Sequence, residues 1–371
     1  MKIVFYSPYF PKHFGGGEKY LLDCITALLE RGRDEVFLAL PTQEFLTQEQ
    51  IAIIRQKYQQ FCAYDLNKLN IIASPLGTEA SFFTKLSWTK KFDVLYHLTD
   101  GSLFFSLAKK NILHIQVPLP ITKKSLVEKL KLKNYHIKNT NSYFTKNYVE
   151  KHWPVTIDYV HQPLVNLAEF PVQKNPLAKK EKIILNVGRF FRQLHSKRQD
   201  VLVSLFARLI EAEPQLMAGW QLHLVGSVED QDYLAEIKTM AKNLPIQIHE
   251  QVDRGALIKL YQKASLYWQA TGYGLDENTH PSAMEHFGIA PIEAMAAYCV
   301  PLLIAKGGHK EVLGSEFSDY LWESDEDCLN QTIALIKNEP ERARVARAMR
   351  LRAEDFGAER FNQLLYKMID D

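Results

Sequence analysis

The chain has few cysteines, no long apolar run and no excess of charge of either sign. Its cysteines, Cys24, Cys62, Cys299 and Cys328, are scattered and form no Cys-x-x-Cys pair. This usage is typical of reduced thiols in a cytoplasmic protein and argues against a disulfide framework or a zinc site. No run approaches the roughly 20 apolar residues that a membrane helix requires. The apolar part of the N-terminal MKIVFYSPYF is too short for a signal peptide.

The charge balance excludes one class of partner. There are 45 Lys and Arg residues against 43 Asp and Glu residues, which gives a formal net charge of +2. No global electrostatic attraction to nucleic acid follows from this balance, and we expect none as a partner. The chain of 371 residues is 46% hydrophobic. That is enough for ordinary cores in about two domains.

Short apolar segments alternate with glycine loops and helical segments, which is the pattern of a doubly wound α/β domain. Residues 2–7 predict a strand, the glycines at 15–17 a loop, and residues 18–31 a helix. The glycines do not complete a GxGxxG motif, because Tyr20 stands where the third glycine would be. A dinucleotide fingerprint is therefore unsupported. Adjacent glycines still let a ligand come close to the backbone.

The strand pattern stops and then restarts in the middle of the chain. Residues 166–182 are polar, lysine-rich and contain proline, which predicts a linker between domains. Residues 182–190, KIILNVGRF, begin a second α/β pattern. We therefore expect an N-terminal domain over 1–168, a second domain over 169–354 and a terminal helix over 355–371.

The most informative stretch is residues 284–312, MEHFGIAPIEAMAAYCVPLLIAKGGHKEV. Gly288 ends an irregular segment, and Pro291 fits the first turn of a helix because that position needs no N–H donor. A short buried strand follows over 299–305. A helix that starts after a glycine presents free N–H groups and about half a positive charge. The sequence therefore predicts a site for a phosphate or diphosphate at this helix end.

Two glutamates bracket this helix start in a Glu-x7-Glu spacing. Glu285 precedes the helix and Glu293 lies about one turn inside it. A carboxylate at such a place can accept hydrogen bonds from the vicinal hydroxyls of a ribose. The alternative is that Glu293 only favours the helix N-terminus while Glu285 is solvated.

The segment EHFGIAPIEAMAAYCVPLL resembles the Glu-x7-Glu signature of retaining glycosyltransferases of family 4, which have the GT-B fold. One departure is Tyr298, which stands where a glycine usually follows EAMAA. The resemblance implies two Rossmann-like domains that face a cleft, with a C-terminal helix that crosses back to the N-terminal domain. It also implies transfer of a hexosyl unit, with retention, from GDP-mannose or a UDP-hexose to a hydroxyl of a glycan or glycolipid.

The resemblance also implies which residues contact the donor. Arg189 and Lys197, in the loop after the strand at 182–190, are expected to neutralise the diphosphate and to stabilise the negative charge of the leaving group. Arg192 and Arg198 are alternatives for this role. Further donor contacts are expected from Gly16 and Gly17 of the first domain and from Glu285, His286, Phe287, Gly288, Ile289 and Glu293.

Two histidines in the first domain lie near the carboxyl ends of predicted strands, where such sheets bind ligands. His114 ends the strand NILH, and His97 ends FDVLYH. Members of the resembling family carry a histidine here, close to the transferred sugar, and His114 is the better match. We expect His114 and Glu285 at the sugar and Glu293 at the ribose, with His97 as the alternative to His114.

Asp325-Glu326-Asp327 matches the Asp-x-Asp pattern of metal-binding sites. It directly precedes a predicted helix, however, where acidic residues are expected as caps. Arg189, Lys197 and a helix terminus can hold a diphosphate without a divalent ion. We therefore expect no metal and no cofactor other than the nucleotide-sugar co-substrate.

Residues 121–153 are rich in lysine, from Lys123 to Lys151. Such a region can hold an anionic membrane surface or an anionic acceptor, at about 1 kcal/mol per basic residue near the surface. The alternative is a solvated helical face. We expect a cytoplasmic protein with a peripheral contact to the inner face of the cell membrane.

Two other functions remain open at the level of the sequence. One is a GT-B sugar-nucleotide epimerase, and the other is a non-catalytic subunit that binds a nucleotide sugar. Incubation of the donor without an acceptor would reveal isomerised sugar in the first case. Measurable hydrolysis of the donor would exclude the second.

Overall fold

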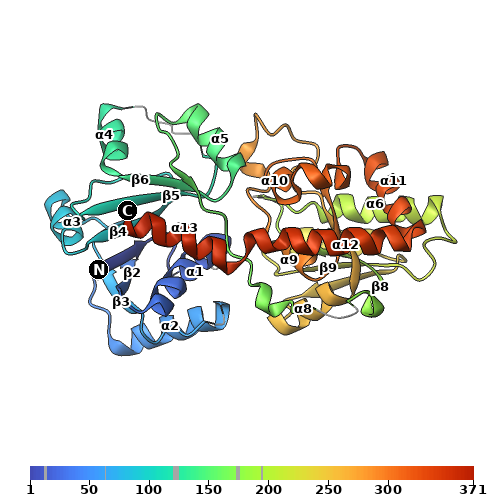
Figure 1. The fold of residues 1–371 in the computed structure, drawn as a ribbon, viewed down its shortest axis with the longest axis horizontal. Helices are drawn as coiled ribbons and strands as arrows, with labels where there is room; N and C mark the ends of the chain where they lie inside the picture. The colour runs from blue at the N-terminus through green and yellow to red at the C-terminus, as the bar shows by residue number, and fades with distance from the viewer. Residues whose placement is uncertain (12–14, 63, 120–124, 173–175, 194) are drawn as a thin grey trace. The chain divides into compact units, whose positions relative to one another are not determined.

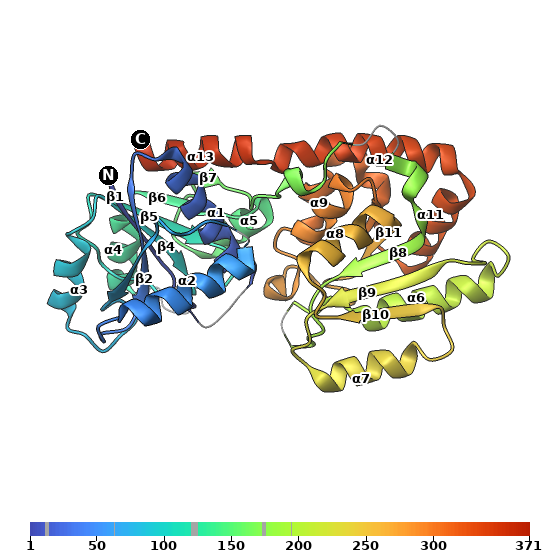
Figure 2. The ribbon, with the colours of Figure 1, turned by 90° about the horizontal axis from the view of Figure 1, so that it is seen from below.

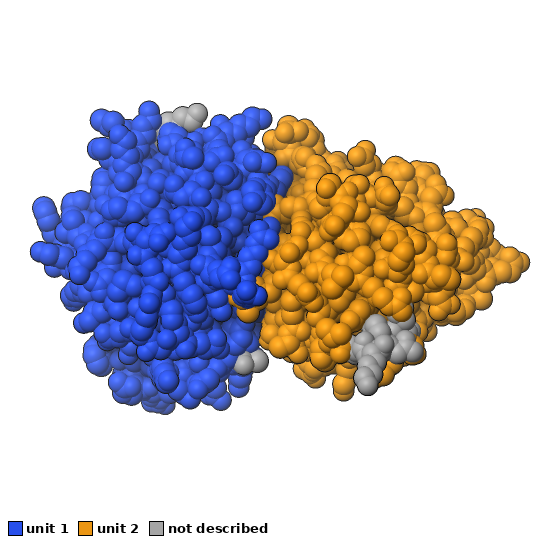
Figure 3. Space-filling view, in the orientation of Figure 1, with its two compact units in different colours: residues 1–164, 359–371 blue, residues 165–358 orange. Residues whose placement is uncertain are grey.

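The computed structural model describes residues 1–11, 15–62, 64–119, 125–172, 176–193 and 195–371. The chain divides into two compact units, which Figure 3 colours separately. Unit 1 comprises residues 1–164 and 359–371, and unit 2 comprises residues 165–358. The divisions fall at 164/165 and 358/359.

The described part of unit 1 contains one parallel sheet of seven strands, in the order β3-β2-β1-β4-β5-β6-β7 (Figure 1). The strands are β1 (Lys2–Tyr6), β2 (Glu35–Pro41), β3 (Asn70–Ser74), β4 (Val94–Thr99), β5 (Lys110–Ile115), β6 (Ile137–Thr140) and β7 (Tyr159–Val160). The helices are α1 (Gly16–Arg31), α2 (Gln48–Cys62), α3 (Phe82–Thr89), α4 (Leu126–Asn134), α5 (Tyr143–His152) and α13 (Ala358–Asp370).

The first strand and helix of unit 1 form where the sequence predicts them. Helix α1 starts at the glycine loop, where the Glu18 side chain accepts a hydrogen bond from the Gly15 N–H at 2.9 Å. It ends at Gly32, whose φ of +73° lies in the left-handed region that glycine favours. Leu21, Ile25 and other apolar residues of α1 belong to the core that contains β1.

The described part of unit 2 contains a second parallel sheet, of six strands, in the order β10-β9-β8-β11-β12-β13. The strands are β8 (Glu181–Val187), β9 (Gln221–Gly226), β10 (Ile246–Glu250), β11 (Ala264–Gln269), β12 (Val300–Ile304) and β13 (Leu321–Trp322). The helices are α6 (Gln199–Ala212), α7 (Gln231–Met240), α8 (Arg254–Lys263), α9 (Ile289–Ala296), α10 (His309–Leu313), α11 (Asp325–Lys337) and α12 (Glu339–Ala353). Short 3-10 helices are η1 (Leu167–Glu169), η2 (Pro176–Lys179), η3 (Pro281–Ala283), η4 (Ser315–Tyr320) and η5 (Glu354–Phe356).

The order of the strands fixes where ligands can bind. In unit 2, β8 lies between β9 and β11, so the direction in which strands are added reverses at β8. In unit 1 the same reversal occurs at β1, between β2 and β4. Open parallel sheets bind ligands at the carboxyl ends of the strands at this switch point. The loop 188–198 after β8 and the glycine loop before α1 both start from such positions, as Figure 2 shows for the two sheets.

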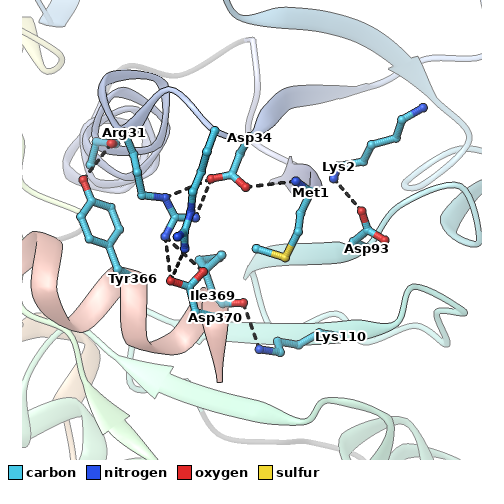
Figure 4. A network of polar contacts seen from close by, with 11 residues as sticks. Met1, Lys2, Arg31, Asp34, Asp93, Lys110, Tyr366, Ile369 and Asp370 are labelled. Atoms are coloured by element: carbon cyan, nitrogen blue, oxygen red, sulfur yellow. Dashed lines mark hydrogen bonds and ion pairs between the residues drawn. The ribbon is translucent and has the colours of Figure 1, made fainter.

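The terminal helix α13 packs within unit 1. Four of its apolar side chains belong to the core that contains β1 and α1: Phe361, Leu365, Met368 and Ile369. Figure 4 shows the polar contacts at its end, where Asp370 accepts hydrogen bonds from Arg31 at 3.1 and 3.2 Å. The Tyr366 hydroxyl donates to the Ala27 carbonyl at 2.9 Å, and Lys110 Nζ donates to the Ile369 carbonyl at 3.0 Å. The helix is therefore part of the core of unit 1.

Candidate functional site

Helix α9 starts where the sequence predicts it, directly after Gly288. The helix begins at Ile289 after Gly288, whose φ of +111° is strained for any side chain but easy for glycine. Pro291 occupies the first turn, where its missing N–H costs no hydrogen bond. At the other end, Tyr298 adopts a φ of +60°, so it takes up the left-handed backbone that the usual glycine would occupy.

The residues on either side of Gly288 lie against the core. Phe287 is 3% exposed, and its ring centroid lies 5.6 Å from that of Phe356. Ile289 is partly buried against the same core. Phe287 thus supports the helix start from within unit 2, and its direct contact with a donor stays a prediction.

Glu285 and Lys197 form an ion pair in unit 2. Nζ of Lys197 lies 2.5 Å from Oε2 of Glu285, and each side chain is 16% exposed. Gln269 Nε2 donates a hydrogen bond to the same oxygen at 3.3 Å. Burial alone would raise the pKa of Glu285, but Lys197 and His309 outweigh it, and the pKa is lowered to about 2. The carboxylate is therefore ionised at neutral pH, where it accepts hydrogen bonds and supplies no proton.

Glycines allow Lys197 to reach this position. A Cβ on Gly188 would lie 2.4 Å from Cγ of Lys197, and a Cβ on Gly226 would lie 2.0 Å from the carbonyl oxygen of Gly188. Neither distance is compatible with a real side chain. The close approach of β9 to the loop after β8 thus depends on these glycines, and that loop carries both predicted cations, Arg189 and Lys197.

The loop after β12 holds the backbone of Glu285. The Gly308 N–H donates to the Glu285 carbonyl at 2.7 Å. Gly307 has a φ of +58°, and a Cβ there would lie 2.3 Å from the same oxygen. Glu277 fixes this loop, because it accepts from the Gly307 N–H at 3.0 Å and pairs with Lys310 at 2.8 Å. The turn at Gly307 and Gly308 therefore packs against the backbone of Glu285.

Neutral histidines surround the ion pair. The rings of His195 and His286 meet edge to face with centroids 4.5 Å apart, and His195 has a φ of +51°. Burial lowers the pKa of His286 to about 3 and that of His309 to about 4. Lys197 is therefore the cation that neutralises Glu285 at pH 7. Of these histidines, sequence reasoning identified only His286.

Glu293 has a partner that sequence reasoning missed. Its side chain is 10% exposed, and its Oε1 accepts a hydrogen bond from Nη2 of Arg254, the first residue of α8, at 2.6 Å. The same guanidinium also pairs with Glu169. No local signal distinguishes Arg254 in the sequence, because its partners are distant along the chain. The predicted contact of Glu293 with a ribose stays a prediction.

The arginines of the loop after β8 lie near the surface and have carboxylate partners. Arg189 is 44% exposed and pairs with Glu229 at 2.9 Å. Of the two alternatives, Arg198 pairs with Asp200 at 2.9 Å and Arg192 pairs with Glu236. Lys197 therefore reaches the buried carboxylate, while Arg189 remains at the exposed edge of the same loop.

The acidic triplet has structural roles. Asp327 accepts a hydrogen bond from the Ser324 N–H at 3.0 Å in the capping box that starts α11. Arg208 pairs with Asp325 at 2.7 Å and with Glu326 at 2.8 Å. The carboxylate of Asp327 therefore caps a helix, and those of Asp325 and Glu326 pair with an arginine.

In unit 1, Gly16 and Gly17 form the first turn of α1. A Cβ on Gly17 would lie 2.8 Å from Oε1 of Gln116, in the segment after β5. A side chain at 17 would therefore require the Gln116 side chain to move. Direct contacts of Gly16 and Gly17 with a donor stay predictions.

The two candidate histidines of unit 1 are both fully buried. The ring of His114 stacks on Tyr20 with centroids 4.0 Å apart, and its Nδ1 lies 2.5 Å from Oδ1 of Asn139. His97 lies 2.9 Å from the hydroxyl of Tyr135. Burial lowers the pKa of each histidine to about 3. A contact of His114 with a sugar stays a prediction, and it would require a local rearrangement.

A family comparison covers most of unit 2. Residues 169–352 match the family described as glycosyl transferases group 1. The chain therefore carries a domain of this group 1 family. It is also 26% identical over 224 residues to the human alpha-1,3/1,6-mannosyltransferase ALG2. That match covers 56% of this chain and 51% of the relative, so it spans about half the length of ALG2.

Solved structures show the fold of this group 1 protein to be GT-B. HepE of Anabaena, solved in complex with UDP and glucose, is 13% identical with a TM-score of 0.68. WaaG, a glycosyltransferase involved in lipopolysaccharide biosynthesis, is 14% identical with a TM-score of 0.61. An E. coli protein bound with UDP-2-fluoro glucose is 11% identical with a TM-score of 0.64. Each similarity covers 100% of this chain and 99% of the other. The predicted fold of two Rossmann-like domains is confirmed.

The family match covers only some of the residues that the sequence predicts for the site of this group 1 protein. Lys197, Glu285, Glu293 and the unpredicted Arg254 all lie within residues 169–352. His114 lies outside the matched segment, as do Gly16 and Gly17. The part of the candidate site with the most polar contacts is therefore also the part that the family comparison covers.

Proposed function

We propose that the protein is a retaining hexosyltransferase of glycosyltransferase family 4. Its donor is a nucleotide-diphosphate sugar, GDP-mannose or a UDP-hexose, and its acceptor is a hydroxyl group of a glycan or glycolipid. The group 1 family domain supports this proposal, as does the similarity to a human mannosyltransferase. The observation that carries it is the Lys197–Glu285 ion pair. This pair belongs to unit 2, which also contains the amino end of α9.

The cations of unit 2 suit a departing diphosphate. When the bond between the anomeric carbon and the diphosphate oxygen breaks, its electron pair stays on the diphosphate, which gains negative charge. Lys197 and Arg189 stabilise that charge together with the free N–H groups at the start of α9. These groups hold the diphosphate without a divalent ion, so we expect activity to persist in EDTA.

The carboxylates suit hydroxyl groups. Glu285 is ionised above its pKa of about 2 and can accept hydrogen bonds from hydroxyls of the donor sugar. Glu293 lies within α9 and is assigned to the ribose hydroxyls. The neighbouring His286 and Gly288 complete the donor side in unit 2, and the glycine loop with Gly16 and Gly17 is assigned to the donor from unit 1.

The test compares donor binding in single variants. Thermal-shift screening against UDP, GDP, ADP and their sugars identifies the donor, because a ligand of the native state raises the apparent melting temperature. We expect Glu293→Ala and Lys197→Ala to weaken binding of that nucleotide at least tenfold, since each removes a charged hydrogen-bonding group worth about 1.5–3 kcal/mol. Unchanged affinity in both folded variants would reject the site. Arg344→Gln, in the exposed Arg344–Glu341 pair, is the control.

We also propose a peripheral membrane contact through α4. Its side chains Leu126, Val127 and Leu130 are 74%, 53% and 47% exposed. The same helix carries Lys129, Lys131 and Lys133. Lys123, where the basic region was expected to begin, lies outside the described residues. Exposed leucines beside lysines suit an anionic lipid surface. No described helix is long and apolar enough to cross a membrane.

The membrane contact is tested by flotation with vesicles. We expect binding to vesicles of phosphatidylcholine mixed with phosphatidylglycerol, and much less to phosphatidylcholine alone. Leu130→Glu should abolish flotation, whereas Leu351→Glu, at a residue of unit 2 that is 66% exposed, should leave it unchanged. Equal flotation of the two variants would show that α4 is a solvated face.

A further inference from the structure

One guanidinium in unit 2 is shared by two carboxylates from different elements. Arg254 begins α8, Glu293 lies in α9 and Glu169 ends η1. Nη2 of Arg254 donates to Oε1 of Glu293 at 2.6 Å, and its Nε donates to Oε2 of Glu169 at 3.1 Å. The side chains of Arg254, Glu169 and Glu293 are 39%, 24% and 10% exposed. The most buried member is the carboxylate assigned to the ribose.

The surroundings hold Arg254 in place. Its guanidinium carbon lies 5.9 Å from the ring centroid of Phe170, which is 2% exposed. Burial would lower the pKa of Arg254, but the two carboxylates outweigh it and raise that pKa. The guanidinium is planar and its donors are fixed in direction, so it can set the orientation of a carboxylate that it contacts.

We infer that Arg254 is a positioning residue for nucleoside recognition, and that Glu169 anchors it. Arg254 fixes the rotamer of Glu293 by holding Oε1, so that the carboxylate meets the ribose hydroxyls in one orientation. Glu169 holds the other edge of the guanidinium. This inference rests on the proposed role of Glu293 at the ribose.

Arg254, Glu293 and Glu169 form a triad of charged side chains. Of these three, Glu169 lies in the segment that links unit 2 to the preceding chain. Residue 165 is the first of unit 2, and η1 follows directly after it. The segment that enters from unit 1 therefore carries one member of the triad. A change in the backbone of this segment acts on Glu293 through Arg254, without any contact of its own with the nucleotide.

The experiment measures recognition of the ribose separately from overall affinity. Purified full-length chain is titrated calorimetrically with UDP, GDP and ADP and with dUDP, dGDP and dADP. The ribose ratio is the Kd of the 2′-deoxy nucleotide divided by that of the ribonucleotide. Loss of one hydrogen bond to a charged group is worth about 1.5–3 kcal/mol, so we expect a ratio of at least about tenfold for the nucleotide that binds best.

The variants separate positioning from stability. Arg254→Gln should reduce the ribose ratio below about threefold while changing the Kd of the deoxynucleotide less than about threefold. Glu169→Gln should give an intermediate ratio, because Arg254 keeps its charge but loses its anchor. Arg344→Gln, which breaks an exposed pair of 2.7 Å in α12, should keep the wild-type ratio. Should Arg254→Gln fail to fold, Arg254→Lys keeps the positive charge and is expected to lower the ratio, because an ammonium lacks the fork geometry.

The outcomes distinguish this inference from the proposed function. A wild-type ratio near one, or no binding of any of the three ribonucleotides, overturns the assignment of Glu293 and with it the proposed site. A wild-type ratio of about tenfold that persists in folded Arg254→Gln or Arg254→Lys overturns only the positioning role. A wild-type ratio in Glu169→Gln overturns the role of Glu169 as the anchor.

Discussion

Removal of the Lys197 charge is the perturbation that tests the site most directly. Lys197→Met keeps the length and the apolar character of the side chain but leaves Glu285 buried without its ion-pair partner. The substitution breaks the ion pair of 2.5 Å, in which both side chains are 16% exposed. An uncompensated buried charge is strongly destabilising.

The pKa of Glu285 gives the magnitude. An ordinary glutamate titrates near 4.5, and the folded protein lowers this pKa to about 2. Because the folded pKa is the lower one, the ionised pair contributes stability above pH 4.5 and loses it as the pH falls to about 2. The difference corresponds to about 3 kcal/mol. Lys197 supplies the largest favourable part, and His309 contributes only where it is protonated, below a pH of about 4. The same order, about 3–5 kcal/mol, is typical when one partner of a buried pair is removed.

A double-mutant cycle measures the pair itself. Lys197→Met, Glu285→Gln and the double variant are unfolded in urea at neutral pH, and unfolding is followed by tryptophan fluorescence, to which Trp220, Trp268 and Trp322 in the core of unit 2 contribute. We expect about 3 kcal/mol of destabilisation in Lys197→Met, and a double variant less destabilised than the sum of the singles by about 2 kcal/mol or more. Additivity within about 0.5 kcal/mol would refute the reasoning, because independent sites add to that precision.

Two further substitutions and a change of pH have effects on binding or stability whose direction follows from the structure. Gly226→Ala places a Cβ 2.0 Å from the Gly188 carbonyl oxygen, so the loop after β8 must shift. We expect at least tenfold weaker nucleotide binding by calorimetry, and unchanged affinity in the folded variant would contradict this reasoning. Phe361→Ala should destabilise unit 1 by about 3–5 kcal/mol in urea unfolding, because it leaves a cavity under α13. Acid should destabilise the fold from about pH 6.5 downward, by up to about 1.4 kcal/mol per pH unit for each buried neutral histidine. The histidines meant are His97, His114, His161 and His309, whose folded pKa values are lowered to about 3 or 4. The unfolded chain therefore binds more protons than the folded protein in this pH range. Urea midpoints that stay constant from about pH 7 to about pH 5 would contradict this prediction.

The fold could be predicted from the sequence to a large extent because its signals are local. A strand, a glycine loop and a helix were expected over residues 2–31, and β1 and α1 form there. A strand was expected over 299–305, and β12 spans Val300–Ile304. Apolar runs and glycines decide these elements within a few residues of the chain. The order of the strands, by contrast, follows from packing between segments that lie far apart.

The sequence suggested candidate site residues one by one but did not show how they pair. Lys197 and Glu285 were each expected at the donor, yet their ion pair joins positions 88 residues apart. Arg254 and Glu169 were missed because each resembles an ordinary charged residue in its own segment. His114 was expected near the carboxyl end of a strand and lies there in β5, but the stacking of its ring on Tyr20 joins residues far apart in the sequence and could not be predicted from its own segment.

The charges of the proposed donor site have protein partners before any donor arrives. Lys197 pairs with Glu285, Arg189 with Glu229, and Glu293 with Arg254. Under the proposed function, a diphosphate that pairs with Arg189 displaces Glu229, so part of its Coulomb energy only replaces that of the Arg189–Glu229 pair. The exposed Arg189–Glu229 pair is screened by salt and costs little to break, since such pairs contribute about 0–1 kcal/mol. The buried Lys197–Glu285 pair costs more to break, so the diphosphate must bind with that pair intact, beside Lys197 and against the free N–H groups of α9.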